Sequence, residues 1–145
     1  MPQIRKSIDI TVSPDNAFSY VTNPMTVPDW AQFIREMKIT EGDGKSAGTR
    51  DAAVFKLGPR AQKQQGEWTV YEPPRTFVRK VAEGTPMESR MTFEAAGEGT
   101  RVEWSMRYTP PLGPVGMMVD MLFMNRVFQN EMEESLETLK AQLEG

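Results

Sequence analysis

The hydrophobic periodicity of the chain changes once, near Gly113, and this change limits the fold more than any other feature. Before Gly113, apolar residues alternate with polar ones in successive short segments, which predicts strands with one buried face. After it, apolar residues recur at helical spacing as far as Leu143, which predicts one long helix. The sequence therefore predicts an α+β domain in which strands precede a C-terminal helix.

Seven segments carry the strand pattern, and turns rich in glycine and proline separate most of them. The first alternates from Ile4 to Val12, and the others are Glu36–Glu41, Thr49–Leu57, Lys63–Tyr71, Phe77–Ala82, Met87–Ala95 and Arg101–Thr109. Because strands joined by short turns pair antiparallel, we predict a seven-stranded antiparallel sheet. The basic stretch Lys56–Lys63 is interpreted as a solvated hairpin loop.

Two short helices are predicted between the first two strands. Ser13 is a suitable N-cap, Pro14 suits the first helical turn, and Pro24 ends the segment. A second short helix is expected at Pro28–Phe33, where it carries Trp30.

Composition excludes several kinds of chemistry. The 145 residues suit a single domain, and they include neither cysteine nor histidine. Disulfides, histidine triads and the commonest zinc ligands are therefore excluded, and we expect neither a metal nor another cofactor. The net charge of −3 gives no basic field for nucleic acid. No apolar segment has the length of a membrane span or a signal peptide, so we expect a cytoplasmic protein.

Six phrases, in order along the chain, resemble those of the helix-grip superfamily, also called SRPBCC. They are SIDITVSPDNAFSYVTNP from Ser7, VPDW from Val27, GTR from Gly48, WTVYEPPRTF from Trp68, GTRVEW from Gly99, and the final helix. Within the superfamily, the chain looks most like the polyketide cyclase/dehydrase-like group, and START-like lipid binders share the superfamily. The resemblance covers nearly the whole chain. We therefore expect residues 1–145 to form a single domain.

The resemblance implies a fold and a class of ligand. The expected fold is a strongly curved seven-stranded sheet with two short helices and a long C-terminal helix over a cavity. The implied ligand is a small hydrophobic molecule held between the sheet and that helix. No catalytic motif is carried over from the superfamily, because its metal and iron–sulfur members use cysteine and histidine.

The C-terminal helix begins with an apolar segment that is rich in methionine. Met117, Met121 and Phe128 fall on one side of the helical wheel, and methionine suits adaptable surfaces. Asn125 is the strongly polar residue on that side, so it contacts either a ligand or a group of the protein itself. On the other side, Val119, Leu122 and Phe123 are also apolar, which is compatible with a covered portal or with a subunit interface.

Alternation assigns residues of each strand to the inner face of the sheet. By this rule Asp51 and Arg79 point inward, where they either pair or orient a polar ligand group. A register slip of one residue would place both in solvent instead. The complete set of predicted ligand-binding residues is Trp30, Phe33, Asp51, Phe55, Trp68, Arg79, Met91, Phe93, Trp104, Met106, Tyr108, Met117, Met121, Asn125 and Phe128.

Three functions remain open at this point. The first is binding of a lipid, polyketide or isoprenoid-like molecule in the cavity. The second is a cyclase or dehydratase reaction, in which proton transfer would depend on Asp51, Arg79, Tyr108 or water. The third is an interaction protein, or a homodimer, that uses the apolar outer side of Val119–Phe123.

Overall fold

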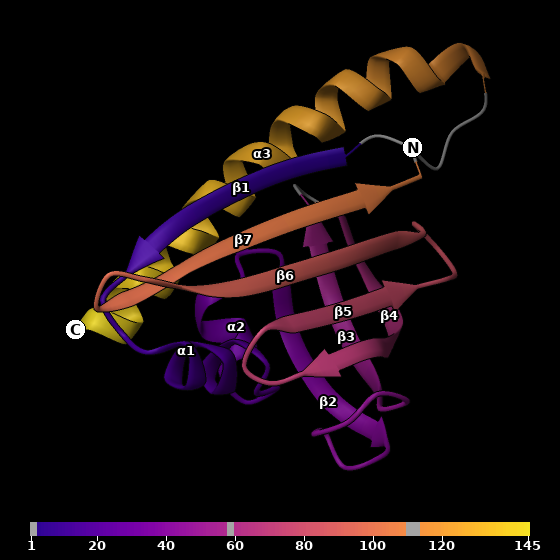
Figure 1. The fold of residues 1–145 in the computed structure, drawn as a ribbon. Helices are drawn as coiled ribbons and strands as arrows, with labels where there is room; N and C mark the ends of the chain where they lie inside the picture. The colour runs from indigo at the N-terminus through magenta and orange to yellow at the C-terminus, as the bar shows by residue number, and fades with distance from the viewer. Residues whose placement is uncertain (1–2, 58–59, 110–113) are drawn as a thin grey trace.

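The computed structural model describes residues 3–57, 60–109 and 114–145, and the side chains of Leu57, Arg60 and 114–122 are outside that description. Within it, seven strands form one antiparallel sheet in the order β1-β7-β6-β5-β4-β3-β2. Three helices accompany the sheet, and the last is by far the longest. The predicted α+β architecture is confirmed, and Figure 1 shows the sheet curling so that β2 and β3 cross the direction of β1 and β7.

The strands lie close to their predicted positions. Their bounds are β1 (Gln3–Ile10), β2 (Ile34–Glu41), β3 (Arg50–Leu57), β4 (Arg60–Glu72), β5 (Thr76–Val81), β6 (Met87–Ala96) and β7 (Gly99–Tyr108). The prediction of a loop over Lys56–Lys63 is wrong for most of that stretch. Leu57 pairs with Arg60, so most of this stretch belongs to the antiparallel pair β3 and β4.

The first two helices follow their sequence signals. In α1 (Pro14–Val21), the Ser13 hydroxyl accepts a hydrogen bond from the Asn16 amide at 3.3 Å, which satisfies one of the free donors at the helix start. The helix α2 (Val27–Trp30) ends three residues before the predicted limit, because Ala31 adopts an extended backbone. Phe18 and Val21 of α1, and Val27 and Trp30 of α2, are buried.

The long helix α3 (Pro114–Glu144) runs beside β1 (Figure 1). In its described part, Phe128, Met132, Leu136 and Leu139 are buried. This is the predicted apolar stripe, and it packs against the core cluster of the sheet and of α1 and α2. Burial of such side chains contributes about 1.5–3 kcal/mol each, so this contact is a principal source of stability for the fold.

Polar contacts fix the position of α3 at two places. Near its C-terminal end, Lys140 Nζ donates to the Asp9 carbonyl at 2.8 Å, and the Thr11 amide donates to Glu144 Oε2 at 2.9 Å. Further back, the Gln32 amide donates to Ser135 Oγ at 2.9 Å. The helix is thereby attached both to the end of β1 and to the segment after α2, which holds that segment over the sheet.

Candidate ligand-binding site

A hollow of about 60 Å³ lies between the inner face of the sheet and the segment that contains α1 and α2. Its walls are mostly apolar. The described lining residues are Val21, Thr22, Val27, Trp30, Ala31, Phe33, Ile34, Met37, Phe55, Gln64, Trp68, Phe77, Arg79, Met87, Ser89, Met91, Trp104 and Met106. An apolar hollow with a few polar groups is the usual form of a small-molecule site.

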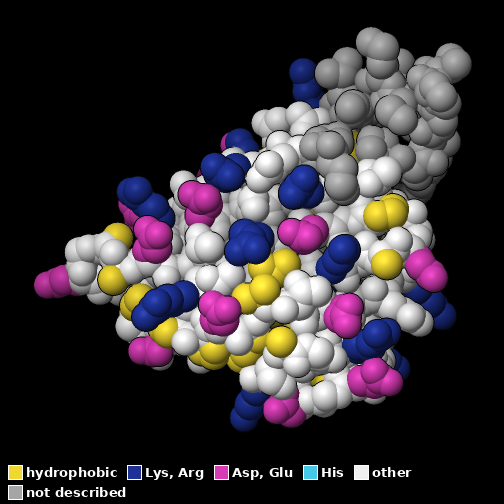
Figure 2. Space-filling view, turned by 45° about the vertical axis from the view of Figure 1, so that its right-hand side comes forward, with side chains coloured by type: hydrophobic (Ala, Val, Ile, Leu, Met, Phe, Trp, Pro, Cys, Tyr) yellow, Lys and Arg dark blue, Asp and Glu magenta, His cyan; other side chains and the backbone are white. Residues whose placement is uncertain are grey.

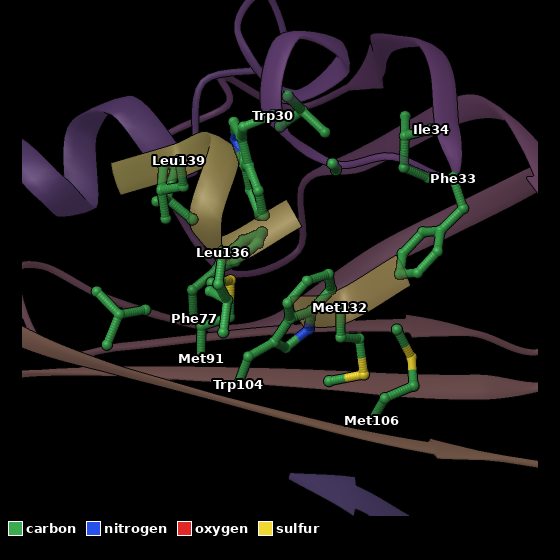
Figure 3. Close-up of a cluster of buried hydrophobic side chains, with 14 of the residues drawn as sticks. Trp30, Phe33, Ile34, Phe77, Met91, Trp104, Met106, Met132, Leu136 and Leu139 are labelled. Atoms are coloured by element: carbon green, nitrogen blue, oxygen red, sulfur yellow. The ribbon is translucent and has the colours of Figure 1, made fainter. Parts of the chain in front are cut away.

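Aromatic rings from three separate parts of the chain meet at the hollow. The Trp30 and Trp104 ring centroids are 5.6 Å apart at an interplanar angle of 70°. The ring centroid of Phe33 lies 5.6 Å from that of Trp104 and 5.5 Å from that of Phe55. Figure 3 shows the Trp30 ring pointing from α2 toward the sheet, and the Trp104 ring pointing from the sheet toward Trp30. These edge-to-face and tilted contacts are favourable for aromatic pairs, so they give the hollow one well-defined wall.

The polar side of the hollow is a buried ion pair. Arg79 Nε and Nη2 donate to the two carboxylate oxygens of Asp51 at 2.8 and 2.7 Å. Trp68 Nε1 donates to Asp51 Oδ2 at 2.9 Å, and Arg79 Nη1 donates to Gln64 Oε1 at 3.4 Å. Asp51 is only 1% exposed. The sequence left open whether Asp51 and Arg79 pair with each other, and the structure shows that they do. Both side chains are buried, so the predicted inward register of their strands is confirmed.

A glycine makes room for this ion pair. Gly66 of β4 pairs with Asp51 of β3, and β4 lies between β3 and β5 in the sheet. A Cβ atom on Gly66 would lie 2.6 Å from Arg79 Nη2 and closer still to Nε. Because real Cβ atoms do not approach other atoms so closely, the guanidinium occupies the space that a side chain would take.

One donor in the lining has no hydrogen-bond partner among the described residues. Trp30 is 3% exposed, and no described residue accepts a hydrogen bond from its Nε1. Buried donors are nearly always hydrogen-bonded in proteins, and an unsatisfied one costs about 1–3 kcal/mol. The indole N–H of Trp30, a residue of the lining, is therefore a buried donor for which the described residues supply no acceptor.

The structure places eight of the fifteen predicted ligand-binding residues in the lining. These are Trp30, Phe33, Phe55, Trp68, Arg79, Met91, Trp104 and Met106. Asp51 is buried behind them as the partner of Arg79. Phe93, Tyr108 and Phe128 are buried in the core without contributing to the described lining, and Asn125 is half-buried and also outside it. The side chains of Met117 and Met121 lie outside the described residues.

The described lining of the hollow differs in one respect from the expected lining. We expected the hollow beneath the C-terminal helix, but none of the described α3 side chains lines it. Phe128 instead contacts the rings of Tyr108, Phe33 and Phe55, with centroids 4.7, 5.8 and 6.1 Å away. Because these large side chains pack together, the described half of α3 closes against the sheet, and the described hollow lies under α1 and α2.

Ten residues of the described lining were not among the ligand-binding residues that the sequence predicted, namely Val21, Thr22, Val27, Ala31, Ile34, Met37, Gln64, Phe77, Met87 and Ser89. Gln64 has the same strand parity as Trp68, and Met87 the same as Met91, so alternation could have found both. Strand alternation also predicts Trp68 and Val70 as the inward pair of β4, and this prediction is wrong for Val70. A bulge between Trp68 and Val70 shifts the register, and Tyr71 stacks on Trp68 instead, with centroids 5.7 Å apart.

The other titratable and charged groups add no catalytic cluster to the described residues. Burial raises the pKa of the Tyr108 phenol above its usual value, which keeps it protonated. No three carboxylates of the described chain are placed to hold a metal ion. Figure 2 shows basic and acidic side chains interspersed over the described part of the visible face. The expectations of no cofactor and no nucleic acid stay predictions.

Two further expectations concern the outer surface. Among the described residues, no helix is both long enough and apolar enough to span a membrane. Phe123 is 63% exposed, whereas the side chains of Val119 and Leu122 lie outside the description. The interface on this side of α3, and with it a homodimer, stays a prediction.

Comparison with known proteins identifies a family and a fold. The model of the family described as "Polyketide cyclase / dehydrase and lipid transport" matches residues 1–144. No curated protein matches the sequence.

Several solved structures share the fold at low sequence identity. TTHA0849 from Thermus thermophilus superposes with a TM-score of 0.80 at 18% identity, over 97% of this chain and 95% of its own. A START superfamily protein from Mycobacterium smegmatis superposes with a TM-score of 0.75 at 14% identity, over 97% of this chain and 98% of its own. XoxI from Bacillus cereus superposes with a TM-score of 0.70 at 20% identity, over 98% of this chain and 95% of its own. At these identities the likeness establishes the helix-grip fold alone.

Proposed function

The chain belongs to the polyketide cyclase/dehydrase and lipid transport family, and we propose that it binds a small hydrophobic molecule in the hollow under α1 and α2. The observation that carries this proposal is the lining itself. Aromatic and methionine side chains from α2 and from six strands converge on one hollow, and the described polar groups there are few. Burial of apolar ligand surface would supply most of the affinity, at about 25 cal/mol per Å².

The size of the hollow requires the wall to move. A volume of about 60 Å³ is smaller than the ~150 Å³ cavity that accommodates benzene in an engineered protein. Four methionines, Met37, Met87, Met91 and Met106, line the hollow. Methionine has flexible torsions and a polarisable sulfur, so it changes rotamer at low cost. We propose that these side chains rearrange to enlarge the hollow when a ligand enters.

The polar groups of the site favour binding over proton transfer. Both carboxylate oxygens of Asp51 accept hydrogen bonds from Arg79, and one also accepts from Trp68. Because these three donors occupy both oxygens, the Asp51 carboxylate is not free to accept a proton from a substrate. Tyr108 does not contribute to the described lining. No contact of these residues supports the cyclase or dehydratase alternative, so ligand binding is the function proposed.

Thermal unfolding with three probe molecules tests the proposal. Methyl decanoate, geraniol and 1,4-naphthoquinone represent the lipid, isoprenoid and polyketide-like classes. A ligand present at 100 times its dissociation constant stabilises the native state by about 2.7 kcal/mol. For a domain of this size, that raises the unfolding temperature by roughly 5–10 °C. We expect at least one probe to produce such a shift in a concentration-dependent manner.

A variant that fills the hollow provides the control. Ala31 lines the hollow and is 3% exposed, so Ala31→Leu places three more carbon atoms in the space a ligand would use. Ala141 is exposed on α3, and Ala141→Leu makes the same change away from the site. Ala31→Leu should abolish the thermal shift, and Ala141→Leu should retain it. Equal shifts in both variants would locate binding elsewhere and contradict the proposal.

A further inference from the structure

The three tryptophans of the chain all line the hollow, but their indole N–H groups differ in one respect. Trp68 Nε1 donates to Asp51 at 2.9 Å, and Trp104 Nε1 donates to Ser89 Oγ at 2.8 Å. Trp30 Nε1 is equally buried, yet no described residue accepts its hydrogen bond. Among the described residues, only Trp30 thus has an indole N–H without an acceptor. The core does provide acceptors for the indole N–H groups of Trp68 and Trp104.

The chemistry of indole restricts what can complement Trp30. Its nitrogen is a donor only, so the complementary group must be a hydrogen-bond acceptor. Trp30 is 3% exposed, which keeps bulk water from serving that role. The acceptor must therefore enter the hollow itself, among apolar neighbours such as Val27 and Ala31.

We propose that the ligand presents a neutral oxygen acceptor, such as a ketone or ester carbonyl or an ether oxygen, to Trp30 Nε1. This inference rests on the proposed function and adds the chemical class of the ligand. The acceptor is neutral because the described cation of the lining, Arg79, is already neutralised by Asp51. An anionic group would then be buried without a counter-charge, which is strongly unfavourable.

Two probes of nearly equal shape separate the acceptor from the rest of the ligand. Cyclohexanone and methylenecyclohexane differ in that a carbonyl oxygen replaces a methylene group. Indole N–H resonances of the ¹⁵N-labelled protein report each tryptophan separately. We expect cyclohexanone to move the Trp30 indole proton downfield, as a new hydrogen bond does. Methylenecyclohexane should bind in the same hollow without that downfield shift.

Affinity in matched variants gives a second measurement. The quantity compared is the ratio of the dissociation constants of cyclohexanone and methylenecyclohexane, because the ratio cancels effects on packing that both probes share. Trp30→Phe removes the free donor and should raise this ratio about fivefold. The control is Leu139→Ala, which removes a buried side chain that lies outside the described lining. The control should leave the ratio within about twofold of its original value.

The outcomes distinguish this inference from the proposed function. If both probes bind but the Trp30 indole proton responds equally to the two, the inference is wrong and the binding function remains. The same holds if the ratio in Trp30→Phe equals that of the control. Should Trp30→Phe fail to fold, the comparison of the two probes on the unaltered protein decides alone. If neither probe perturbs any of the three indoles, the inference is overturned, whereas the thermal shifts with the three larger probes decide the proposed function separately.

Discussion

Arg79 on β5 reaches Asp51 on β3 across the strand that lies between them. The contact is possible because Gly66 of β4 has no side chain at the point of crossing. Two parallel N–H···O bonds of 2.7 and 2.8 Å give the bidentate geometry for which arginine is suited. Three neighbouring strands thus share one buried polar centre, and it forms one side of the hollow.

Gly66→Ala is expected to destabilise the protein by roughly 3 kcal/mol or more, the lower end of the cost of breaking a buried ion pair. The added Cβ would lie 2.6 Å from Arg79 Nη2, so the guanidinium must move and Asp51 loses its partner. Urea unfolding measures the change. A loss of less than about 0.5 kcal/mol, within the range of a surface substitution, would contradict this account.

Asp51→Asn should be more damaging than removal of the whole ion pair. The single change leaves the Arg79 guanidinium buried without a counter-charge, and we expect a loss of about 3–5 kcal/mol. In the double variant Asp51→Asn with Arg79→Met, the uncompensated charge is gone. The double variant should therefore be more stable than Asp51→Asn alone, as a double-mutant cycle by urea unfolding would reveal. Additive losses would mean that the two residues do not interact.

Met91→Ala should both destabilise the protein and widen its choice of ligand. Met91 is 3% exposed and lines the hollow, so truncation costs about 2–5 kcal/mol and enlarges the space. Leu139→Ala removes a buried side chain outside the described lining. Both variants should lose similar stability, but only Met91→Ala should bind a bulkier homologue of a bound probe more tightly than the unaltered protein. Identical ligand preferences would contradict the proposed wall.

Asn125→Ala should leave ligand affinity within about twofold, because no direct hydrogen bond to a ligand is lost. The sequence made Asn125 the leading polar contact, yet the structure leaves its half-buried side chain outside the described lining. Removing a direct hydrogen bond to a ligand would instead weaken binding by roughly 0.5–1.5 kcal/mol, or about two- to twelvefold. Titration of the variant with whichever probe stabilises the protein measures the difference. A loss near the upper end of that range would restore the original interpretation of Asn125.

Asp9 should contribute to loss of stability in acid. The hydrogen bonds from Arg101, with Nε 3.0 Å from Oδ1, hold the pKa of the Asp9 carboxyl below its ordinary 3.8. The folded state thus binds fewer protons than the unfolded state, so the contribution is present above about pH 4 and disappears as the pH falls through the lowered pKa. Asp9→Asn should make the decline in unfolding midpoint between about pH 5 and about pH 2 shallower. Arg101→Gln, which removes the partner, should have the same effect, and an unchanged slope in both would be contrary evidence.

Most of the fold could be predicted because its signals are local. Alternation located all seven strands, and helical spacing located α3, since each pattern records which side of an element faces the core. The inward positions of Asp51, Phe55, Trp104 and Met106 were predicted by the same rule and are buried. The bulge after Trp68 was not predicted, because an extra residue in one strand depends on the partner strand and leaves no periodic trace.

The candidate site was predicted less completely, for a related reason. Eight residues of the lining were identified from strand parity and from aromatic character. The place of the hollow was predicted under α3, but it depends on how far Phe128 and its aromatic neighbours fill the space there. Volume filled by side chains from distant segments is a property of their packing, and no single segment encodes it.

The sequence by itself determined the order of strands and helices, the inner face of most strands, and the absence of histidine and cysteine chemistry. These follow from the residue types and their spacing, which need no knowledge of the partner segments. Only the tertiary structure decided that Arg79 pairs with Asp51 over Gly66, that the hollow lies under α1 and α2, and that Trp30 Nε1 lacks, among the described residues, the partner that Trp68 and Trp104 have. Each of these depends on atoms brought together from at least two elements, and such distances are fixed by the packed chain rather than by local pattern.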